Sequence, residues 1–474
     1  MNTEASSVTQ SSARIVVGGV LLCAAACTAP LLFGAATNRS VAVLLLASVL
    51  SLLVAPRPRS PWTQGLVVAI GAGFLIYCLI ALLQLWLLGQ WFPVPLLVEA
   101  QDALGAPDEL ARAATLNPSR IGEALPRSAL VTAALLAAVL FGQSRRFAYR
   151  CLSAIVVAGL TTVIGALILH HVDPGSVLWQ QKKAYLRDFT ATFISRGAAG
   201  AWLCLIATTS LALLVRHVSR LLEDDIPDGA AAVTRMIAAA LHTPMTTLFL
   251  LAGVAVPAYG LLLTESRLAL LVLSIQVAGL AIFLAVYGSR RSAVAGLLAA
   301  SIVIAAGVAL LWAGGGGITE RILDSDLTRD GRWAIWQSTL AGIFERPVLG
   351  FGAGTLRDGF PLFRSEQLIA FGEVRSAHSL PLELAFESGV VVASLVSAAW
   401  IAVCIVLASR VLRLEKFDGL SAAALAAATG AVCFTGFDVA SQSFGYVLPM
   451  LVVVGLGLAQ MDGRLPRERH GGPM

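Results

Sequence analysis

Residues 128–172 have the sequence SALVTAALLAAVLFGQSRRFAYRCLSAIVVAGLTTVIGALILHHV, which decides the fold class of the chain. Two apolar runs, 128–142 and 152–171, are separated only by the arginine-dense stretch QSRRFAYR. With their flanking residues, both runs approach the roughly 20 residues that a helix needs to cross a bilayer. The segment therefore predicts two antiparallel membrane helices joined by a short basic loop.

The composition extends this prediction to the whole chain. Of its 474 residues, 57% are hydrophobic and 13% are charged, whereas soluble domains carry roughly 25% charged residues. We therefore expect an all-α integral membrane protein. Despite the net charge of +5, no nucleic-acid-binding module is recognisable. The seven cysteines lie in or beside apolar runs, so we interpret them as small core residues and expect no disulfide framework.

Further apolar runs bring the expected number of transmembrane helices to about 12, with both termini on one side. The runs are 15–36, 41–55, 65–88, 128–142, 152–171, 198–215, 244–263, 268–288, 293–313, 390–409, 420–438 and 442–460. The first run has signal-peptide features, since Arg14 precedes it and it contains the small residues CAAACTA. Its length of roughly 20 residues favours a retained helix.

The loops fall into two classes that alternate along the chain. Short arginine-dense loops, such as PRPRS and RHVSR, are expected on the cytoplasmic side by the positive-inside rule. Long loops at 89–127, 172–197 and 314–389 are expected on the outer side, where the helically patterned part of the first would lie along the membrane surface. The chain then divides into residues 1–313 with helices one to nine, the large and mainly helical loop 314–389, and residues 390–474 with helices ten to twelve and a cytoplasmic tail.

The large loop contains the densest polar chemistry of the chain. GGGG at 314–317 is expected to act as a hinge. The stretch GRWAIWQSTLAGIFERPVLGFGAG (331–354) predicts a helix with Trp333, Trp336 and Leu340 on one face, ended by Pro347 and three glycines.

The stretch SAHSLPLELAFESG (376–389) predicts a second helix that runs into the tenth span, with Ser379 as N-cap. His378 then lies just outside a helix N-terminus at the outer membrane surface. The partial positive charge of that N-terminus favours a neutral imidazole, the form required of a general base. A histidine at a helix start is also a common local cap, so this reading needs support from other residues.

Three arginines provide that support. Arg196 begins the sixth span and Arg332 follows a turn in the large loop. Arg267 lies in a turn of about four residues close to the apolar region, where a charge is costly unless it is used. Its alternative role is snorkelling to the interface beside Glu265.

Other patterns are weaker. LGFGAG (349–354) lacks the strand and helix of a dinucleotide site, and DSDLTRD (324–330) lacks the glycine of a calcium loop. We therefore expect no metal site. Glu383 and Glu387 lie on one helix face, and we expect one of them to orient His378 or an acceptor hydroxyl.

At these residues the chain resembles the O-antigen ligase and polymerase superfamily of bacterial membrane glycosyltransferases. GRWAIWQSTLAGIFERPVLGFGAGTL (331–356) resembles the family's Arg-and-Trp segment before Pro-x-x-Gly-x-Gly, and SAHSLPLELAFESGVV (376–391) its Ala-His-Asn segment, with Ser379 in place of Asn. TESRLALL (264–271) is similar to its Ser-Arg motif. TATFISRGAAGAWL (190–203) resembles a Gly-Thr-Phe-x-Asn-x-Asn stretch but differs at three positions.

The resemblance implies an enzyme of the bacterial inner membrane that works on its periplasmic side. It would move a glycan from undecaprenyl diphosphate to a hydroxyl acceptor without cofactor or metal, and with inversion at the anomeric carbon. Catalytic roles then fall to His378, Arg267 and Arg196. Substrate-binding roles fall to four further residues, Arg332, Glu383, Glu387 and Ser379.

The acceptor stays open at this point. A polymerase would use another lipid-linked repeat unit, and a ligase would use a lipid A core. ATLNPSRIGEALPRSALVTAALLAAVLFG (114–142) resembles a segment of polysaccharide polymerases, which favours the first slightly. A flippase for the same lipid-linked glycan is the alternative from another class, although such transporters typically show repeated halves.

Overall fold

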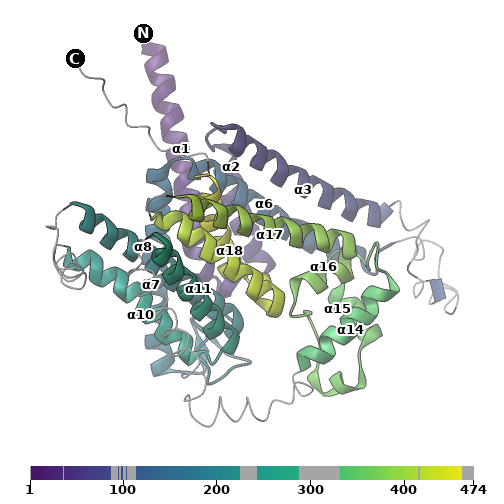
Figure 1. Ribbon diagram of the computed structural model, residues 1–474. Helices are drawn as coiled ribbons and strands as arrows, with labels where there is room; N and C mark the ends of the chain where they lie inside the picture. Colours follow the sequence, from purple (N-terminus) through teal and green to yellow (C-terminus); the bar gives the residue numbers. More distant parts are fainter. Residues whose placement is uncertain are drawn as a thin grey trace, which may run out of the picture.

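A computed structural model describes residues 2–35, 37–86, 94, 98–99, 103, 114–224, 243–287, 331–414 and 417–461. Within this part the chain is a bundle of helices with one two-stranded sheet (Figure 1). Eight helical segments are long and apolar enough to cross a membrane, and three shorter apolar helices accompany them. The all-α membrane class predicted from composition is therefore confirmed, while the number of 12 is not.

The predicted spans correspond closely to the observed helices. The helices of the first half are α1 (Asn2–Thr28), α2 (Asn38–Leu53), α3 (Pro61–Trp86), α6 (Ile121–Gly142), α7 (Arg145–Val172) and α8 (Arg196–Asp224). Those of the second half are α10 (Pro244–Leu263), α11 (Arg267–Tyr287), α17 (Val390–Arg413), α18 (Gly419–Phe437) and α19 (Phe444–Leu458). The expected ninth span at 293–313 and the GGGG hinge at 314–317 lie outside the described residues.

One boundary differs from the prediction. The outer loop was expected to continue to residue 127, whereas α6 already begins at Ile121, after the short 3-10 helix η4 (Pro118–Arg120). The first two turns of α6 contain polar residues such as Glu123 and Arg127, so a search for apolar runs does not detect where this helix begins. Asn117 precedes η4 and accepts a hydrogen bond from Ser119 N at 3.1 Å, so the predicted Asn-Pro break is present.

The core of the bundle surrounds α8 and α19, whose residues are largely buried. Small residues let the neighbours of α19 approach closely. A Cβ on Gly455 would lie 2.6 Å from the Cβ of Ala138 in α6, and one on Gly457 would lie 2.2 Å from the Cβ of Ala424 in α18. Close approach through small residues is how helices associate in a bilayer, where burial of apolar surface gives little driving force.

The short arginine-dense loops meet at one end of the bundle, which we call the short-loop end. Asp418 caps α18 there and accepts hydrogen bonds from Arg145 Nη2 at 2.8 Å and Tyr149 Oη at 2.6 Å. Trp62 Nε1, at the start of α3, donates to Leu458 O at 3.0 Å. These contacts join the starts of α3, α7 and α18 and the end of α19, four segments that were all predicted to lie on the cytoplasmic side.

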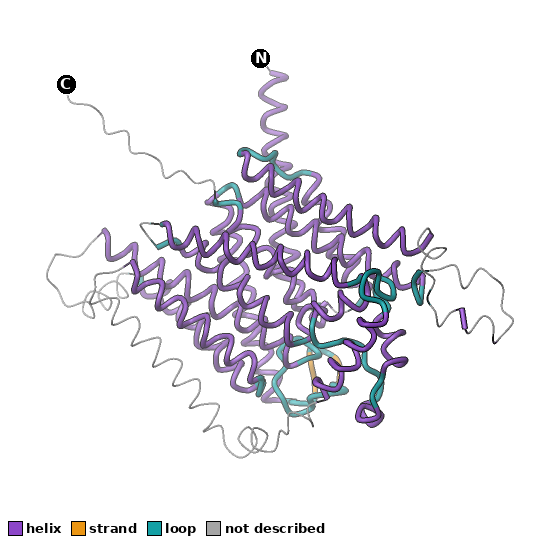
Figure 2. Tube along the Cα trace, turned by 45° about the vertical axis from the view of Figure 1, so that its right-hand side comes forward, coloured by secondary structure: helices purple, strands orange, loops and turns teal. Residues whose placement is uncertain are grey.

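The long loops meet at the opposite end, the long-loop end (Figure 2). The sheet of β1 (Ser176–Val177) and β2 (Gln180–Gln181) lies in the loop after α7. Trp179, between the strands, contacts the ring of Phe33 with centroids 4.8 Å apart. Ser443 Oγ donates to Gly34 O at 2.8 Å, so the loops before α2 and α19 also meet here.

The described part of the large loop, residues 331–389, is mainly helical, as predicted. It contains α14 (Gly331–Glu345), α15 (Leu356–Gly359), the 3-10 helices η5 (Phe360–Phe363) and η6 (Glu366–Phe371), and α16 (Leu380–Ser388). These elements pack around Phe351, Phe363 and Phe386, with ring centroids of Phe351 and Phe386 4.7 Å apart.

Trp333 and Trp336 of α14 lie side by side, as the predicted common face requires, with their ring centroids 6.3 Å apart. Trp333 and Leu340 are 53% and 39% exposed, whereas Trp336 turns inward and donates from Nε1 to Ala377 O at 2.9 Å. Trp336 is half-buried, at the edge of this face that lies nearest to the rest of the loop. Trp336 therefore joins α14 to the residue before His378.

Candidate functional site

The turn between α18 and α19 is the centre of the candidate site. It consists of Asp438 and the 3-10 helix η7 (Val439–Gln442). Asp438 is almost fully buried, and its Oδ2 lies 3.5 Å from Arg332 Nη2 in the first turn of α14. Arg332 Nη1 also donates to Phe437 O at 3.3 Å. The structure thus brings the large loop onto the end of α18 through an arginine that the sequence singled out.

The first turn of α8 approaches the same carboxylate. A Cβ at Gly197 would lie 2.2 Å from Asp438 Oδ1, so glycine is required for this contact. Arg196, one residue earlier, pairs with Asp188, with Nη1 and Oδ2 3.4 Å apart, and its guanidinium lies 5.4 Å from the centre of the Tyr185 ring. Arg196 and Arg332 therefore belong to two segments that meet at Asp438.

Arg267 begins α11 directly beside the start of α8. Residues 264–266 form the turn from α10, which is as short as the sequence indicated. Ser266 Oγ accepts a hydrogen bond from Ala269 N at 3.4 Å. A Cβ on Gly200 would lie 2.6 Å from the Cβ of Ala269, so the first turns of α8 and α11 pack together. The half-buried Arg267 is thereby placed on a helix start adjacent to that of Arg196.

His378 lies in a tightly held turn before α16. Its backbone is left-handed, with a φ of 52°, a conformation that a non-glycine residue adopts only when its surroundings impose it. Ser376 Oγ accepts from His378 N at 3.1 Å and donates to Glu383 Oε2 at 3.0 Å. Ala377 N donates to the same oxygen at 3.3 Å.

Glu383 connects this turn to η7. Gln442 Nε2 donates to Glu383 Oε1 at 3.0 Å, so the last residue of η7 binds the carboxylate that also binds the Ser376–Ala377 peptide. The expectation that a glutamate orients His378 stays a prediction. The contacts show Glu383 binding the two residues that precede His378.

Ser379 stands at the N-cap position of α16, and Pro381 lies in its first turn, as the sequence indicated. The predicted capping hydrogen bond is wrong, because the Ser379 side chain makes none to the helix. Glu383 accepts from the Ala377 amide and thereby orders this helix start in its place. Ser379 itself is buried.

Glu387, one turn further along α16, binds the glycine loop of residues 347–354. Leu356 N donates to Glu387 Oε1 at 3.1 Å, and Gly352 N donates to Glu387 O at 2.9 Å. The loop has positive φ at Gly350, Gly352 and Gly354, and a Cβ on Gly350 would lie 2.5 Å from the Glu387 carbonyl carbon. Gly350 is therefore needed for close contact with α16, whereas a Cβ at Gly352 or Gly354 would meet Thr115 or Arg120.

The two glutamates differ in surroundings as well as in partners. Burial raises the pKa of Glu383, while hydrogen bonds from Ser376 and Gln442 oppose that rise. Burial and the neighbouring Glu383 raise the pKa of Glu387 to about 8. Arg127 of α6 lies near enough to lower the pKa of both carboxyl groups. Glu387 is therefore largely protonated at neutral pH.

This protonation predicts a pH-dependent stability. A glutamate whose pKa is higher in the folded than in the unfolded protein stabilises the fold fully below its ordinary pKa of about 4.5, and this contribution is lost as the pH rises through about 8. We expect the Tm of the purified protein to fall between about pH 4.5 and about pH 8, and Glu387→Gln to flatten that fall. Differential scanning fluorimetry measures both.

The matched control is Glu345→Gln at the exposed end of α14, which should leave the slope unchanged. An equal slope in wild type and Glu387→Gln would show that folding does not raise the pKa of Glu387.

The sequence had not singled out Asp438, Gln442 or Arg127. Asp438 carried a usable signal, because an acidic residue at the last position of an apolar run is costly unless it is paired. No local sequence pattern indicates Gln442 or Arg127, because their partner Glu383 is 59 and more than 200 positions away in the chain, respectively.

The chemistry available at this site is anion binding next to a histidine. Three arginines lie on converging segments, and guanidinium groups bind phosphate oxygens with a planar fork of donors. Among the described residues, no group of three histidine, cysteine or acidic side chains is arranged to hold a metal ion.

Comparison with known proteins agrees with these features. No curated protein matches the chain. Residues 248–397 match the family model described as O-antigen ligase. This range runs from α10 into α17 and includes Arg267, Arg332 and His378, while Arg196 and Asp438 lie outside it. The match supports the resemblance to the O-antigen ligase and polymerase superfamily, and with it a general O-antigen ligase-like or polymerase-like function.

Proposed function

We propose that the protein is a glycosyltransferase that moves a glycan from undecaprenyl diphosphate to a hydroxyl acceptor in surface polysaccharide assembly. The observation that supports this most is the convergence at Asp438 and η7. Arg332, the start of α8 with Arg196, and the turn that holds His378 all meet there, and Arg267 begins the adjacent helix. The site lies at the long-loop end, which in this proposal faces the periplasm from the bacterial inner membrane.

The proposed reaction is a single displacement. His378 accepts the proton of the acceptor hydroxyl as its oxygen attacks the anomeric carbon. The bond between that carbon and the diphosphate oxygen breaks, and the diphosphate leaves with the electron pair. Arg267, Arg196 and Arg332 stabilise its negative charge. One in-line displacement inverts the configuration at the anomeric carbon.

The ion pairs seen in the structure are compatible with this role. Arg196 and Arg332 lie 3.4 and 3.5 Å from their carboxylate partners, and about a third of each arginine side chain is exposed. The carboxylate of Asp438 is buried and that of Asp188 is half-buried, so both need these partners. A diphosphate could therefore share the exposed guanidinium donors while the two aspartates stay paired.

Two acceptors fit this chemistry, and we favour the polymerase form, in which the acceptor is another lipid-linked repeat unit. Its support is the polymerase-like segment 114–142, which is joined to the large loop through Arg120 and Asp358, with Nη2 and Oδ1 2.9 Å apart. A ligase would instead use a lipid A core as acceptor.

A deletion strain tests the proposal. Gel analysis of its surface glycan should show single repeat units in place of long chains if the protein is a polymerase. Complete absence of glycan from the lipid A core, with polymer retained on the carrier, would make it a ligase. Unchanged chain length and attachment in the deletion strain would refute the proposed function. Accumulation of unpolymerised lipid-linked units on the cytoplasmic side would indicate a flippase.

Transfer should also proceed without a divalent metal, because three arginines supply the positive charge that the leaving group requires. Purified protein is given lipid-linked donor and acceptor in excess EDTA, and product formation should match that of an untreated sample. Loss of product that magnesium or calcium restores would contradict the arginine-based mechanism.

A further inference from the structure

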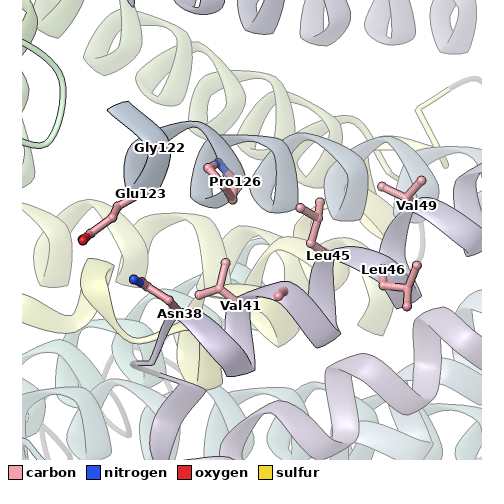
Figure 3. Close-up of a pocket in the computed structure, with 9 residues that line it drawn as sticks. Asn38, Val41, Leu45, Leu46, Val49, Gly122, Glu123 and Pro126 are labelled. Carbon is pink, nitrogen blue, oxygen red and sulfur yellow. The ribbon is translucent and has the colours of Figure 1, made fainter. Parts of the chain in front are cut away.

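An apolar groove lies between α2 and α6 (Figure 3). Its volume is about 420 Å³, which is within the range of roughly 300–1,000 Å³ typical of ligand sites. One wall is a stripe on α2 with Val41, Leu45 and Val49 at helical spacing, and the other includes Pro126 of α6. Nothing lies within 4 Å of the Cβ position of Gly122, so the groove is open at this point of α6.

One end of the groove is polar. Asn38 and Glu123 lie there (Figure 3), at the starts of α2 and α6, and both starts belong to the long-loop end. Arg127 Nη2 donates to Asn38 Oδ1 at 3.1 Å. The Nε of Arg127 is buried and has no hydrogen-bond partner. A buried guanidinium donor without an acceptor is costly, and an anionic group is the acceptor that would best complete it.

The polar end also adjoins the candidate site. Arg127 is near enough to Glu383 and Glu387 to favour their charged forms. Glu383 in turn binds Gln442 and the residues before His378. Arg127 thus approaches the carboxylates of α16 from α6, whereas Arg332 approaches η7 from α14.

The apolar part of the groove opens toward the surface that faces lipid. Leu46, which lines it, is 60% exposed, and Val43 and Leu53 on the same helix are also exposed. Exposed apolar residues on a membrane helix contact the hydrocarbon of the bilayer. A ligand dissolved in the membrane could therefore enter the groove laterally from the bilayer. The mainly apolar lining does not suit a water-soluble ligand.

We propose that the α2–α6 groove binds the isoprene units next to the diphosphate of the polyprenyl carrier, and that Arg127 contributes to binding the diphosphate. This inference rests on the proposed function, because it assigns the tail of the same donor. From Val41 to Val49 the stripe is about 12 Å long at the helical rise of about 1.5 Å per residue. Only the first isoprene units would fit along it, and the remaining tail would stay in the bilayer.

A labelling experiment tests the groove without requiring transfer. The full-length protein in nanodiscs is irradiated with an undecaprenyl diphosphate that carries a diazirine on an isoprene unit near the diphosphate. Labels should fall on residues 38–49 and 122–126, and excess unlabelled undecaprenyl diphosphate should remove them. Removal by an equal excess of phosphatidylglycerol would show that the groove takes ordinary phospholipid, and labels spread over other lipid-facing helices would show that it takes no carrier. Either result overturns the proposal.

Two matched substitutions on α2 separate filling of the groove from a general effect of added bulk. Leu45→Trp occupies the groove, while Val43→Trp places the same ring on an exposed face that does not line it. We expect Leu45→Trp to raise the KM for the long-chain donor about tenfold or more, because apolar contact with the tail is lost. A donor whose tail is too short to extend along the groove should be used equally by both variants and by wild type. Equal KM values for the long-chain donor in both variants would contradict the proposal.

A second pair of substitutions tests Arg127. Arg127→Ala removes the charge, and Asn38→Ala removes only its hydrogen-bond partner. We expect Arg127→Ala to weaken competition by undecaprenyl diphosphate about tenfold, since hydrogen bonds to charged groups contribute about 1.5–3 kcal/mol, and Asn38→Ala to change it little. Equal competition in Arg127→Ala and wild type would remove Arg127 from the site. If the wild type shows no transfer with any donor, the proposed function fails, and the labelling result still decides whether the groove binds the carrier.

Discussion

Replacing His378 with alanine should lower glycan transfer by about 10² to 10⁴-fold, the usual contribution of a general base. The imidazole is the proposed acceptor for the proton of the attacking hydroxyl, and alanine leaves that proton without a base. The structure holds the backbone of His378 in a left-handed conformation through Ser376 and Glu383. Transfer is measured in membranes of a strain that lacks the native copy, at matched abundance of the variant.

His171→Ala is the matched control. His171 is an exposed histidine at the long-loop end of α7, and its Nδ1 lies 3.1 Å from Leu167 O of its own helix. We expect this variant to transfer glycan as wild type does. If His378→Ala keeps activity within a few-fold of wild type, His378 is not the base.

Glu383→Gln distinguishes positioning from chemistry in the same assay. The amide keeps the size of the side chain but replaces one of the two oxygens that accept from Ser376, Ala377 and Gln442. If Glu383 acts by placing His378, its loss should lower kcat and leave the KM for the donor nearly unchanged. A raised KM with unchanged kcat would instead indicate direct contact with substrate.

Replacing Arg267 with alanine should abolish transfer, and replacing it with lysine should impair transfer severely. Arg267 starts α11 next to the start of α8, and in the proposed mechanism it binds the diphosphate of the carrier. Lysine keeps the charge but loses the planar fork that binds two oxygens at once. Transfer by both variants is measured at matched membrane abundance, which also reports whether they insert and fold.

The alternative role of Arg267 makes the opposite prediction. A side chain that only snorkels to the interface can be lysine as well as arginine, so a fully active Arg267→Lys variant would leave Arg267 as a topological anchor. Phosphate binding would then fall to Arg196 and Arg332. Arg187, an exposed arginine of the loop before α8, provides the control, because Arg187→Lys and Arg187→Ala should both be fully active.

The sequence by itself determined the features that depend on local composition. Apolar runs long enough to cross a bilayer must form helices, because a helix satisfies every backbone hydrogen bond within the segment. This constraint located eleven of the described helices, eight of which belong to segments long and apolar enough to cross a membrane, and the short turn before Arg267. Local steric rules likewise anticipated the break at Pro347 and the glycine loop, where Gly350, Gly352 and Gly354 all adopt positive φ.

Some local predictions failed or were incomplete where a neighbouring segment intervened. Ser379 occupies the N-cap position but does not cap, because Glu383 and the turn at Ser376 order that helix start. Trp336 is half-buried beside the exposed Trp333 because it binds Ala377 O, 41 positions later. Periodicity alone places a side chain on a helix, but the packed partner decides which face is buried.

The tertiary structure alone decided which polar residues meet. Asp438 binds Arg332 across 106 positions of sequence, Gln442 binds Glu383 across 59, and Arg127 faces both glutamates of α16. Such pairs depend on which helix ends are packed side by side, and the local sequence does not predict that packing. Charges buried at helix ends are stable only with partners, so the packing of the bundle, through residues such as Gly197 and Gly200, determines where the arginines of this site lie.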